Sequence, residues 1–293
     1  MMTKEVRSQF WYSDGRRLSG LSTLLLLLPF FAVIAFVFIY PIAQLLLISF
    51  LEPHPTLDNY ARVVDNPVHA RVLMRTLWTA ALVTALSAVL GFPVAYYMSR
   101  TKGAPAALVA VCVILPLWSS VLVRTAAWSF LFQRNGLINS ALMALGLTSQ
   151  PFKLLYTQSA VVIAMTHVLL PFMILPIYGA LRSIPNDYAR AAAVLGATRL
   201  RTFLEVILPL SLPGVVSGSL LVFLTALGFF ITPALLGSPQ EMMISTLVSK
   251  QIREVLDWPF AAALVGGLTF FVTLLAIVFS KTLRFDRLMG SAS

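Results

Sequence analysis

Long apolar segments alternate with short polar ones along almost the whole chain. The hydrocarbon core of a bilayer is about 30 Å thick, and a helix needs about 20 residues to cross it. Backbone groups in lipid must find their partners within the segment, so such segments are predicted to be helices, and none shows the period-two alternation of a barrel strand. Six segments are long enough: 21–50, 76–98, 104–132, 159–181, 206–231 and 260–279.

The composition agrees with a membrane protein. Of the 293 residues, 59% are hydrophobic and only 11% are charged, whereas soluble domains carry roughly 25% charged residues. The net charge of +10 is typical of nucleic-acid binding. Here, however, the basic residues are spread over short segments between the apolar ones, which does not favour a nucleic-acid partner. The single cysteine, Cys112, excludes a disulfide framework within the chain.

The distribution of basic residues predicts the orientation. If the N-terminus is inside the cell, most of the 21 Lys and Arg residues lie in the inner segments, as expected for cytoplasmic loops. Both termini are therefore predicted to be cytoplasmic, in agreement with an even number of spans. The first 20 residues are polar, and the apolar run after them is too long for a signal peptide, so 21–50 is predicted to be a retained first span.

The polar segment after the fourth predicted span differs from the other loops. Asn186 or Asp187 is a candidate N-cap, residues 188–195 are strong helix formers, and Gly196 is a candidate C-terminal stop. This pattern predicts a two-turn helix. Its centre, residues 191–193, has almost no side-chain bulk, so the helix fits deep in a groove on another protein. An ordinary connecting helix is the alternative interpretation.

The spacing around this helix carries a family resemblance. Residues 190–192 read Arg-Ala-Ala, Gly196 follows after three residues, and residues 206–209 read Val-Ile-Leu-Pro after nine more. The pattern resembles the cytoplasmic signature loop of permease subunits of binding-protein-dependent ABC importers, although Arg190 stands where that family usually has Glu. Four further segments are similar, in the same order, to the spermidine/putrescine permease group: 115–128, 170–178, 232–237 and 257–260.

The resemblance covers roughly residues 20–288 and implies an all-α integral membrane protein with about six transmembrane helices, similar to type I ABC importer permeases. It implies a cytoplasmic segment 1–20, a transmembrane permease domain 21–288 with a coupling loop 183–205, and a tail 289–293. The loop helix is then the coupling helix that docks on a cytoplasmic ATPase subunit. The residues expected to make that contact are Asp187, Tyr188, Arg190, Ala191, Ala192, Leu195 and Gly196.

The same resemblance implies partners and a location. The chain has no Walker motif, so it is expected to bind no cofactor, and ATP and Mg are used by the partner. The expected partners are two ATPase subunits, a second permease subunit that is a different chain, an extracytoplasmic solute-binding protein and the lipid bilayer. The expected location is the inner membrane of a bacterial cell, with several crossings.

Polar residues at membrane depth are candidates for the translocation pathway, since they are costly in lipid. Arg124 either faces a pathway or extends to the outer interface. His167 either forms a hydrogen bond between helices or belongs to a site, and Trp118 and Trp128 are candidate pathway residues or interfacial anchors. The candidate set is Trp118, Ser119, Ser120, Arg124, Thr125, Trp128, His167 and Phe229.

The resemblance favours a polyamine, or a related small amine, opine or amino-acid-like solute. No Asp or Glu lies in the middle of a predicted span, and Phe229 stands where related permeases often have an acidic residue. The charges within the spans therefore suit an anionic or zwitterionic solute equally well.

Two other function classes remain as alternatives. An intramembrane enzyme is disfavoured because the chain has no HExxH or GxSxG motif and no metal-ligand spacing among its three histidines. A secondary transporter or channel without an ATPase would need intramembrane ion ligands or an inverted repeat, and neither is visible in the sequence. This alternative also leaves the short helix centred on residues 191–193 unexplained.

Overall fold

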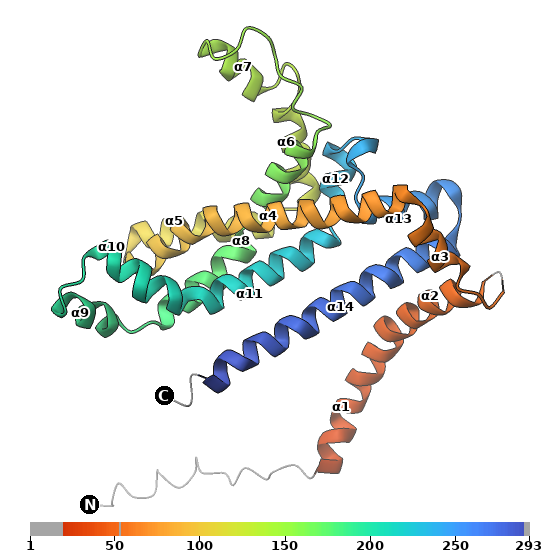
Figure 1. Ribbon diagram of the computed structural model, residues 1–293, viewed down its shortest axis with the longest axis horizontal. Coiled ribbons are helices and arrows are strands. Elements are labelled where there is room, and N and C mark those ends of the chain that lie inside the picture. Colours follow the sequence, from red (N-terminus) through yellow and green to blue (C-terminus); the bar gives the residue numbers. More distant parts are fainter. Residues whose placement is uncertain (1–19, 53, 290–293) are drawn as a thin grey trace, which may run out of the picture.

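The computed structural model describes residues 20–52 and 54–289, and this part of the chain is helical, without strands. Short π or 3-10 segments connect several of the helices. The helices are α1 Gly20–Ile34, α2 Tyr40–Leu51, α3 Asp58–Asp65, α4 Pro67–Arg100, α5 Ala104–Trp118, α6 Val121–Leu131, α7 Leu137–Ala144, α8 Gln158–Ser183, α9 Asn186–Val194, α10 Arg199–Thr202, α11 Leu208–Leu227, α12 Ile231–Leu236, α13 Ile244–Lys250 and α14 Trp258–Met289 (Figure 1).

Five helices of the described chain are long and apolar enough to cross a membrane, and a bent pair can supply a sixth crossing. They confirm the predicted helical class. The third predicted span is not one straight helix, because α5 and α6 meet at an angle of 102°. The second span begins at Pro67 rather than at residue 76. The fifth begins at Arg199, because α10 and α11 are continuous through a π-helical turn, and it ends at Leu227.

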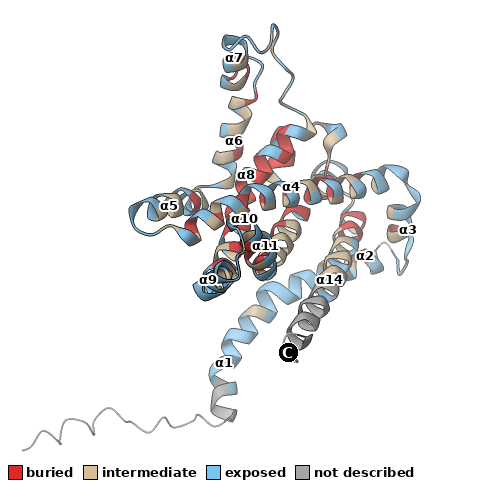
Figure 2. Cartoon of the chain, turned by 60° about the vertical axis from the view of Figure 1, so that its left-hand side comes forward, coloured by how far each residue is buried: buried red, intermediate tan, exposed pale blue. Residues whose placement is uncertain are grey.

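The core lies where α4, α8 and α11 meet, and α8 is its centre (Figure 2). The buried side chains of α8 include Met165, Leu169 and Met173. On α11, a Cβ added to Gly214 would lie 2.5 Å from Ala180 Cβ, and one added to Gly218 would lie 2.9 Å from Met173 Sδ. Gly214 and Gly218 form a GxxxG step, in which small residues let two backbones approach closely.

The N-terminal helices α1 and α2 lie apart from this core. The apolar window within Leu26–Leu51 is 0% buried in the chain, and α2 packs against α14. Figure 1 shows α9 at one end of the bundle, with α3 and α13 at the opposite end. The end of the bundle with α9 is called the α9 end below, and the end with α3 and α13 is called the outer end.

Candidate functional site

Helix α9 starts and stops for different local reasons. Its N-cap is Pro185, without a side-chain hydrogen bond to the helix, so the predicted capping by Asn186 or Asp187 is wrong. The Asn186 carboxamide oxygen instead accepts a hydrogen bond from Arg100 at 3.2 Å, and the ring of Pro185 fixes a φ of −60° that suits a helix start. At the other end Gly196 has φ +83°, which confirms it as the stop.

Gly196 closes a Schellman motif. Its N–H donates to the Ala193 carbonyl at 3.0 Å, and the N–H of Ala197 donates to the Ala192 carbonyl at 3.0 Å. A Cβ added at Gly196 would meet no atom within 4 Å, so the positive φ, rather than space, favours glycine there.

Helix α9 and the residue after it carry large apolar side chains that nothing in this chain covers. Val194 is 87% exposed and Leu195 is 86% exposed, and Tyr188 is exposed beside them. Arg190 and Asp187 form a solvent-exposed ion pair of 3.5 Å, which contributes little to stability. The predicted contact residues therefore lie on α9 and the two residues that follow it, and none of them is buried; exposed apolar side chains of this kind are typical of a surface that meets another protein.

The elbow between α5 and α6 is formed by two serines. Both the N–H and the hydroxyl of Ser119 donate to the Pro116 carbonyl, and the extended backbone of Ser120 turns the chain into α6. Arg124 spans the elbow, since its guanidinium donates to the Ser119 carbonyl and to the Val168 carbonyl of α8, each at 3.4 Å. Its buried Nε has no hydrogen-bond partner among the described residues.

Two further polar pairs hold α6 against its neighbours. The indole N–H of Trp128 donates to Nδ1 of His167 on α8 at 3.2 Å, and the two rings meet edge to face. The hydroxyls of Thr125 and Thr232 lie 3.0 Å apart in the buried contact between α6 and α12. Arg124, Thr125, Trp128 and His167 thus form one cluster on α6 and α8, called the elbow cluster below.

Two of the predicted pathway residues lie elsewhere. Trp118 is 89% exposed and lines a shallow apolar hollow on α5. Phe229 packs against the core at the end of α11, and its carbonyl accepts the hydroxyl of Ser245 at 2.6 Å. The structure therefore divides the predicted pathway set among the elbow with its cluster, the surface of α5 and the end of α11.

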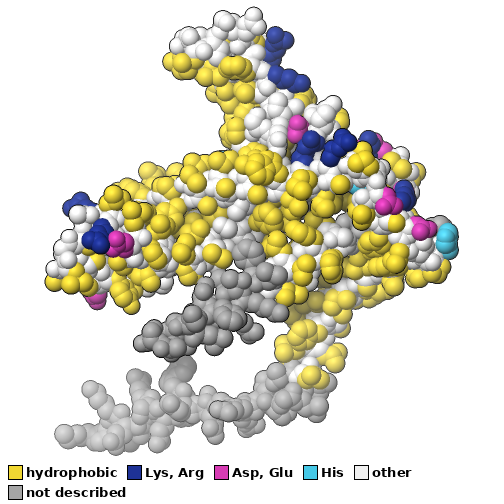
Figure 3. Space-filling model, viewed as in Figure 1, with side chains coloured by type: hydrophobic (Ala, Val, Ile, Leu, Met, Phe, Trp, Pro, Cys, Tyr) yellow, Lys and Arg dark blue, Asp and Glu magenta, His cyan; other side chains and the backbone are white. Residues whose placement is uncertain are grey.

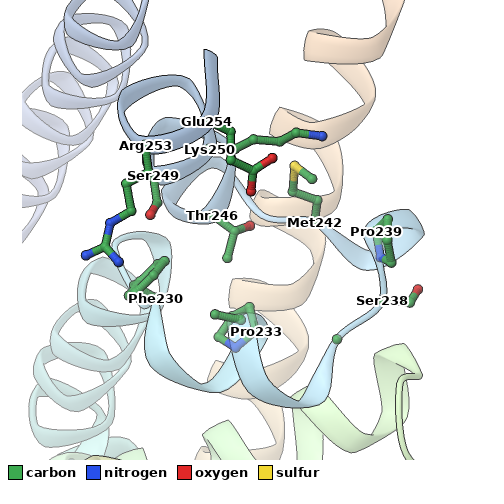
Figure 4. A pocket seen from close by; sticks show the side chains of 12 residues that line it. Phe230, Pro233, Ser238, Pro239, Met242, Thr246, Ser249, Lys250, Arg253 and Glu254 are labelled. Carbon is green, nitrogen blue, oxygen red and sulfur yellow. The ribbon is translucent and has the colours of Figure 1, made fainter. Parts of the chain in front are cut away.

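Sequence reasoning missed a pocket of about 380 Å³ between α12 and the α13 segment. Figure 4 shows Phe230 and Pro233 on one side and the polar side chains of α13 and the turn after it on the other. Arg253 extends toward Phe230, and Lys250 extends away from it. Residues 237–258 read as a polar loop, and the pocket arises because the helical turns that carry Lys250, Arg253 and Glu254 fold back toward Phe230 and Pro233.

Comparison with known proteins adds three observations. Residues 91–287 match the family model described as binding-protein-dependent transport system inner membrane component. The chain is 34% identical over 236 residues to the spermidine/putrescine transport system permease protein PotB of Escherichia coli (strain K12), covering 80% of this chain and 86% of that protein. It is also 34% identical over 203 residues to the molybdenum transport system permease protein ModB of Mycobacterium bovis, covering 69% and 75%.

The fold is shared with a solved transporter. A crystal structure of a bacterial ABC transporter involved in the import of the acidic polysaccharide alginate matches with a TM-score of 0.69 at 20% identity. The match covers 89% of this chain and 94% of that chain.

Proposed function

The chain belongs to the family of binding-protein-dependent transport system inner membrane components, as the non-catalytic permease subunit of an ABC importer, and from this premise we propose that it carries a polyamine or a related small amine. It is a multi-pass inner membrane protein. The observation that carries the proposed substrate is the 34% identity to a spermidine/putrescine permease over 80% of the chain. The family membership removes the alternatives of an intramembrane enzyme and of a secondary transporter.

We infer that α9 is the coupling helix. Its exposed Val194 and Leu195 supply an apolar surface, and the Schellman motif at Gly196 fixes where the helix ends. The proposed partner at this surface is an ATPase subunit that binds ATP and Mg, with two such subunits in the complex. A second permease chain, different from this one, and an extracytoplasmic binding protein complete the proposed assembly. The α9 end is then cytoplasmic.

A second candidate substrate is an amino-acid-like zwitterion, and Arg124 is the observation that favours it. The guanidinium is held by two backbone carbonyls at 3.4 Å, and none of the ion pairs found in the described chain involves it. A guanidinium without an acidic partner attracts a carboxylate and repels a polyamine. The relative ModB, named for molybdenum transport, is as identical to this chain as the polyamine permease is.

Purification from mild detergent followed by uptake in proteoliposomes tests both proposals. We expect an ATPase with a Walker motif and a second permease to co-purify, and ATP-dependent uptake of labelled spermidine in the presence of the binding protein. If an amino acid or opine competes for uptake and spermidine does not, the proposed substrate is the zwitterion and not the polyamine. A stable chain that co-purifies with no ATPase would contradict the coupling assignment of α9.

A further inference from the structure

Residues 121–156, called the arm below, project from the bundle as a separate element. Figures 1 and 2 show α7 standing clear of α4, α8 and α11, at the far end of α6, whose base packs against α8 and α12. Helix α6 is bent by 102° from α5. Because α5 runs with the membrane-crossing helices, the arm runs roughly parallel to the plane of the membrane. It starts at the end of α5 that is remote from α9 and leaves the bundle between the α9 end and the outer end, on the outer side of α5 (Figure 1).

The arm is internally fixed despite its position. The Asn139 side chain is buried, donates to the Gln133 and Phe152 carbonyls at 3.1 and 3.0 Å, and accepts the Phe152 N–H at 2.9 Å. Phe132 is 3% exposed and stacks on Trp128 with ring centroids 5.0 Å apart. These contacts hold the two ends of the α7 segment together, so the arm presents a defined surface.

That surface is cationic on one side and apolar on the other. The arm contains no Asp or Glu. Arg134 and Lys153 are exposed, and neither takes part in an ion pair within the described part of the chain. In Figure 3 the dark blue groups of the arm lie on its edge toward the outer end, while hydrophobic atoms cover the edge toward α9. Leu137 and Leu145 are at least 70% exposed on this arm.

Arg134 and Lys153 line the same hollow, of about 410 Å³. The other side chains that line it are aromatic or aliphatic, including those of Phe132, Phe152 and Tyr156. Two cations over an aromatic and aliphatic wall match the chemistry of a phospholipid at the interface, where the phosphate takes the cations and the wall takes the upper acyl chain.

We propose that this hollow binds the phosphate of an anionic phospholipid headgroup in the outer leaflet, with the arm lying in the membrane interface. The apolar edge of the arm then enters the acyl region, and its cationic edge stays at headgroup level, as in interfacial amphipathic helices. The lipid is the favoured occupant because the cations and the apolar surface lie on opposite edges along the membrane normal. This site is independent of the transported solute, so it goes beyond the proposed function.

The test uses the assembled importer, purified, stripped of lipid and titrated with phosphatidylglycerol in native mass spectrometry. Each cation near an anionic lipid surface contributes about fivefold in affinity. We expect Arg134→Gln and Lys153→Gln each to weaken lipid binding about fivefold and the double variant about 25-fold. Arg71→Gln removes an exposed cation of α4 outside the hollow and is expected to bind like the unmodified chain.

Three results would overturn the proposal. The first is a double variant that binds phosphatidylglycerol as tightly as Arg71→Gln. The second is loss of lipid binding on addition of inorganic phosphate, which would make the hollow a site for the free ion. The third concerns the other possible occupant: a photo-crosslinker at Leu145 in native membranes that captures the second permease chain, and no lipid, would make the arm a protein interface.

Discussion

The hydroxyl of Thr125 lies 3.0 Å from the hydroxyl of Thr232, and both side chains are 0% exposed. This contact fastens the arm to α12, the short helix between α11 and the pocket of Figure 4. Thr125 was predicted as a pathway residue, and its hydroxyl is directed into a helix contact within this chain.

Replacing Thr125 with Val is expected to destabilise the protein by about 1–3 kcal/mol, since it leaves the Thr232 hydroxyl buried without its partner. Thermal unfolding of the complex in detergent measures this. The double variant Thr125→Val, Thr232→Val removes both hydroxyls and is expected to recover most of the loss. Equal destabilisation of the single and double variants would show that the pair is not energetically coupled.

Gly196→Asp is expected to uncouple transport from ATP hydrolysis while the chain stays in the membrane. Any side chain at φ +83° costs about 1–2 kcal/mol of local strain. The substitution is therefore expected to distort the backbone at the end of α9. The ATPase activity stimulated by loaded binding protein is the measurement. Gly146→Asp is the matched control, because Gly146 also has a positive φ of 70° with open space around it. Intact stimulation in Gly196→Asp would remove α9 from the coupling path.

Arg124→Gln is expected to lower the uptake rate at least about tenfold if the guanidinium binds a charged group of the solute, which corresponds to about 1.4 kcal/mol. Arg124→Lys keeps the charge but loses the planar fork that spans two carbonyls, so partial activity is expected. Initial rates against solute concentration separate these cases. Unchanged kinetics in both variants would make Arg124 a structural residue of the elbow.

Asp257→Ala is expected to destabilise the protein by about 1 kcal/mol. One carboxylate oxygen accepts the Phe260 N–H at 3.1 Å in the first turn of α14, as an N-cap does, and the other pairs with Arg62 at 2.9 Å. Arg62→Gln leaves the cap in place and removes the exposed ion pair, together with the hydrogen bond of Arg62 to Asn59 and its cation–π contact with Phe260. It is expected to cost less, because these contacts lie at the surface. Melting temperatures that fall equally for the two variants would assign the effect to the ion pair instead of the cap.

The spans were predictable because membrane thickness dictates long apolar helices. The close approach of Gly214 and Gly218 to α8 agrees with their GxxxG spacing, because small residues permit close packing. The 102° elbow was not predictable, since residues 104–132 form one long, mainly hydrophobic run, and hydropathy does not report the extended backbone of Ser119 and Ser120. The end of α9 followed from Gly196. The predicted cap at its start was wrong, because the Asn186 side chain binds Arg100, which lies 86 positions away in the sequence.

The elbow cluster illustrates the same limit. Arg124 and His167 stood out separately as polar residues in apolar segments, and hydropathy alone does not place them side by side. Their proximity depends on the packing of α6 across α8, which is set by contacts such as Trp128 with His167 and Arg124 with the Val168 carbonyl. The pocket beside α13 likewise depends on turns that no local pattern specifies.

At Gly214 the backbone of α11 lies so close to Ala180 and the Pro176 carbonyl of α8 that not even a Cβ fits between the two helices. The chain leaves α8, forms α9 and returns through α10 into α11. Both ends of α9 are therefore connected to the same end of the α8–α11 pair. Two backbones in contact leave no soft layer of side chains to absorb a displacement. A displacement of α9 is therefore expected to tilt α8 and α11 together and to move the other end of the pair, on the order of 40 Å away along Arg199–Leu227.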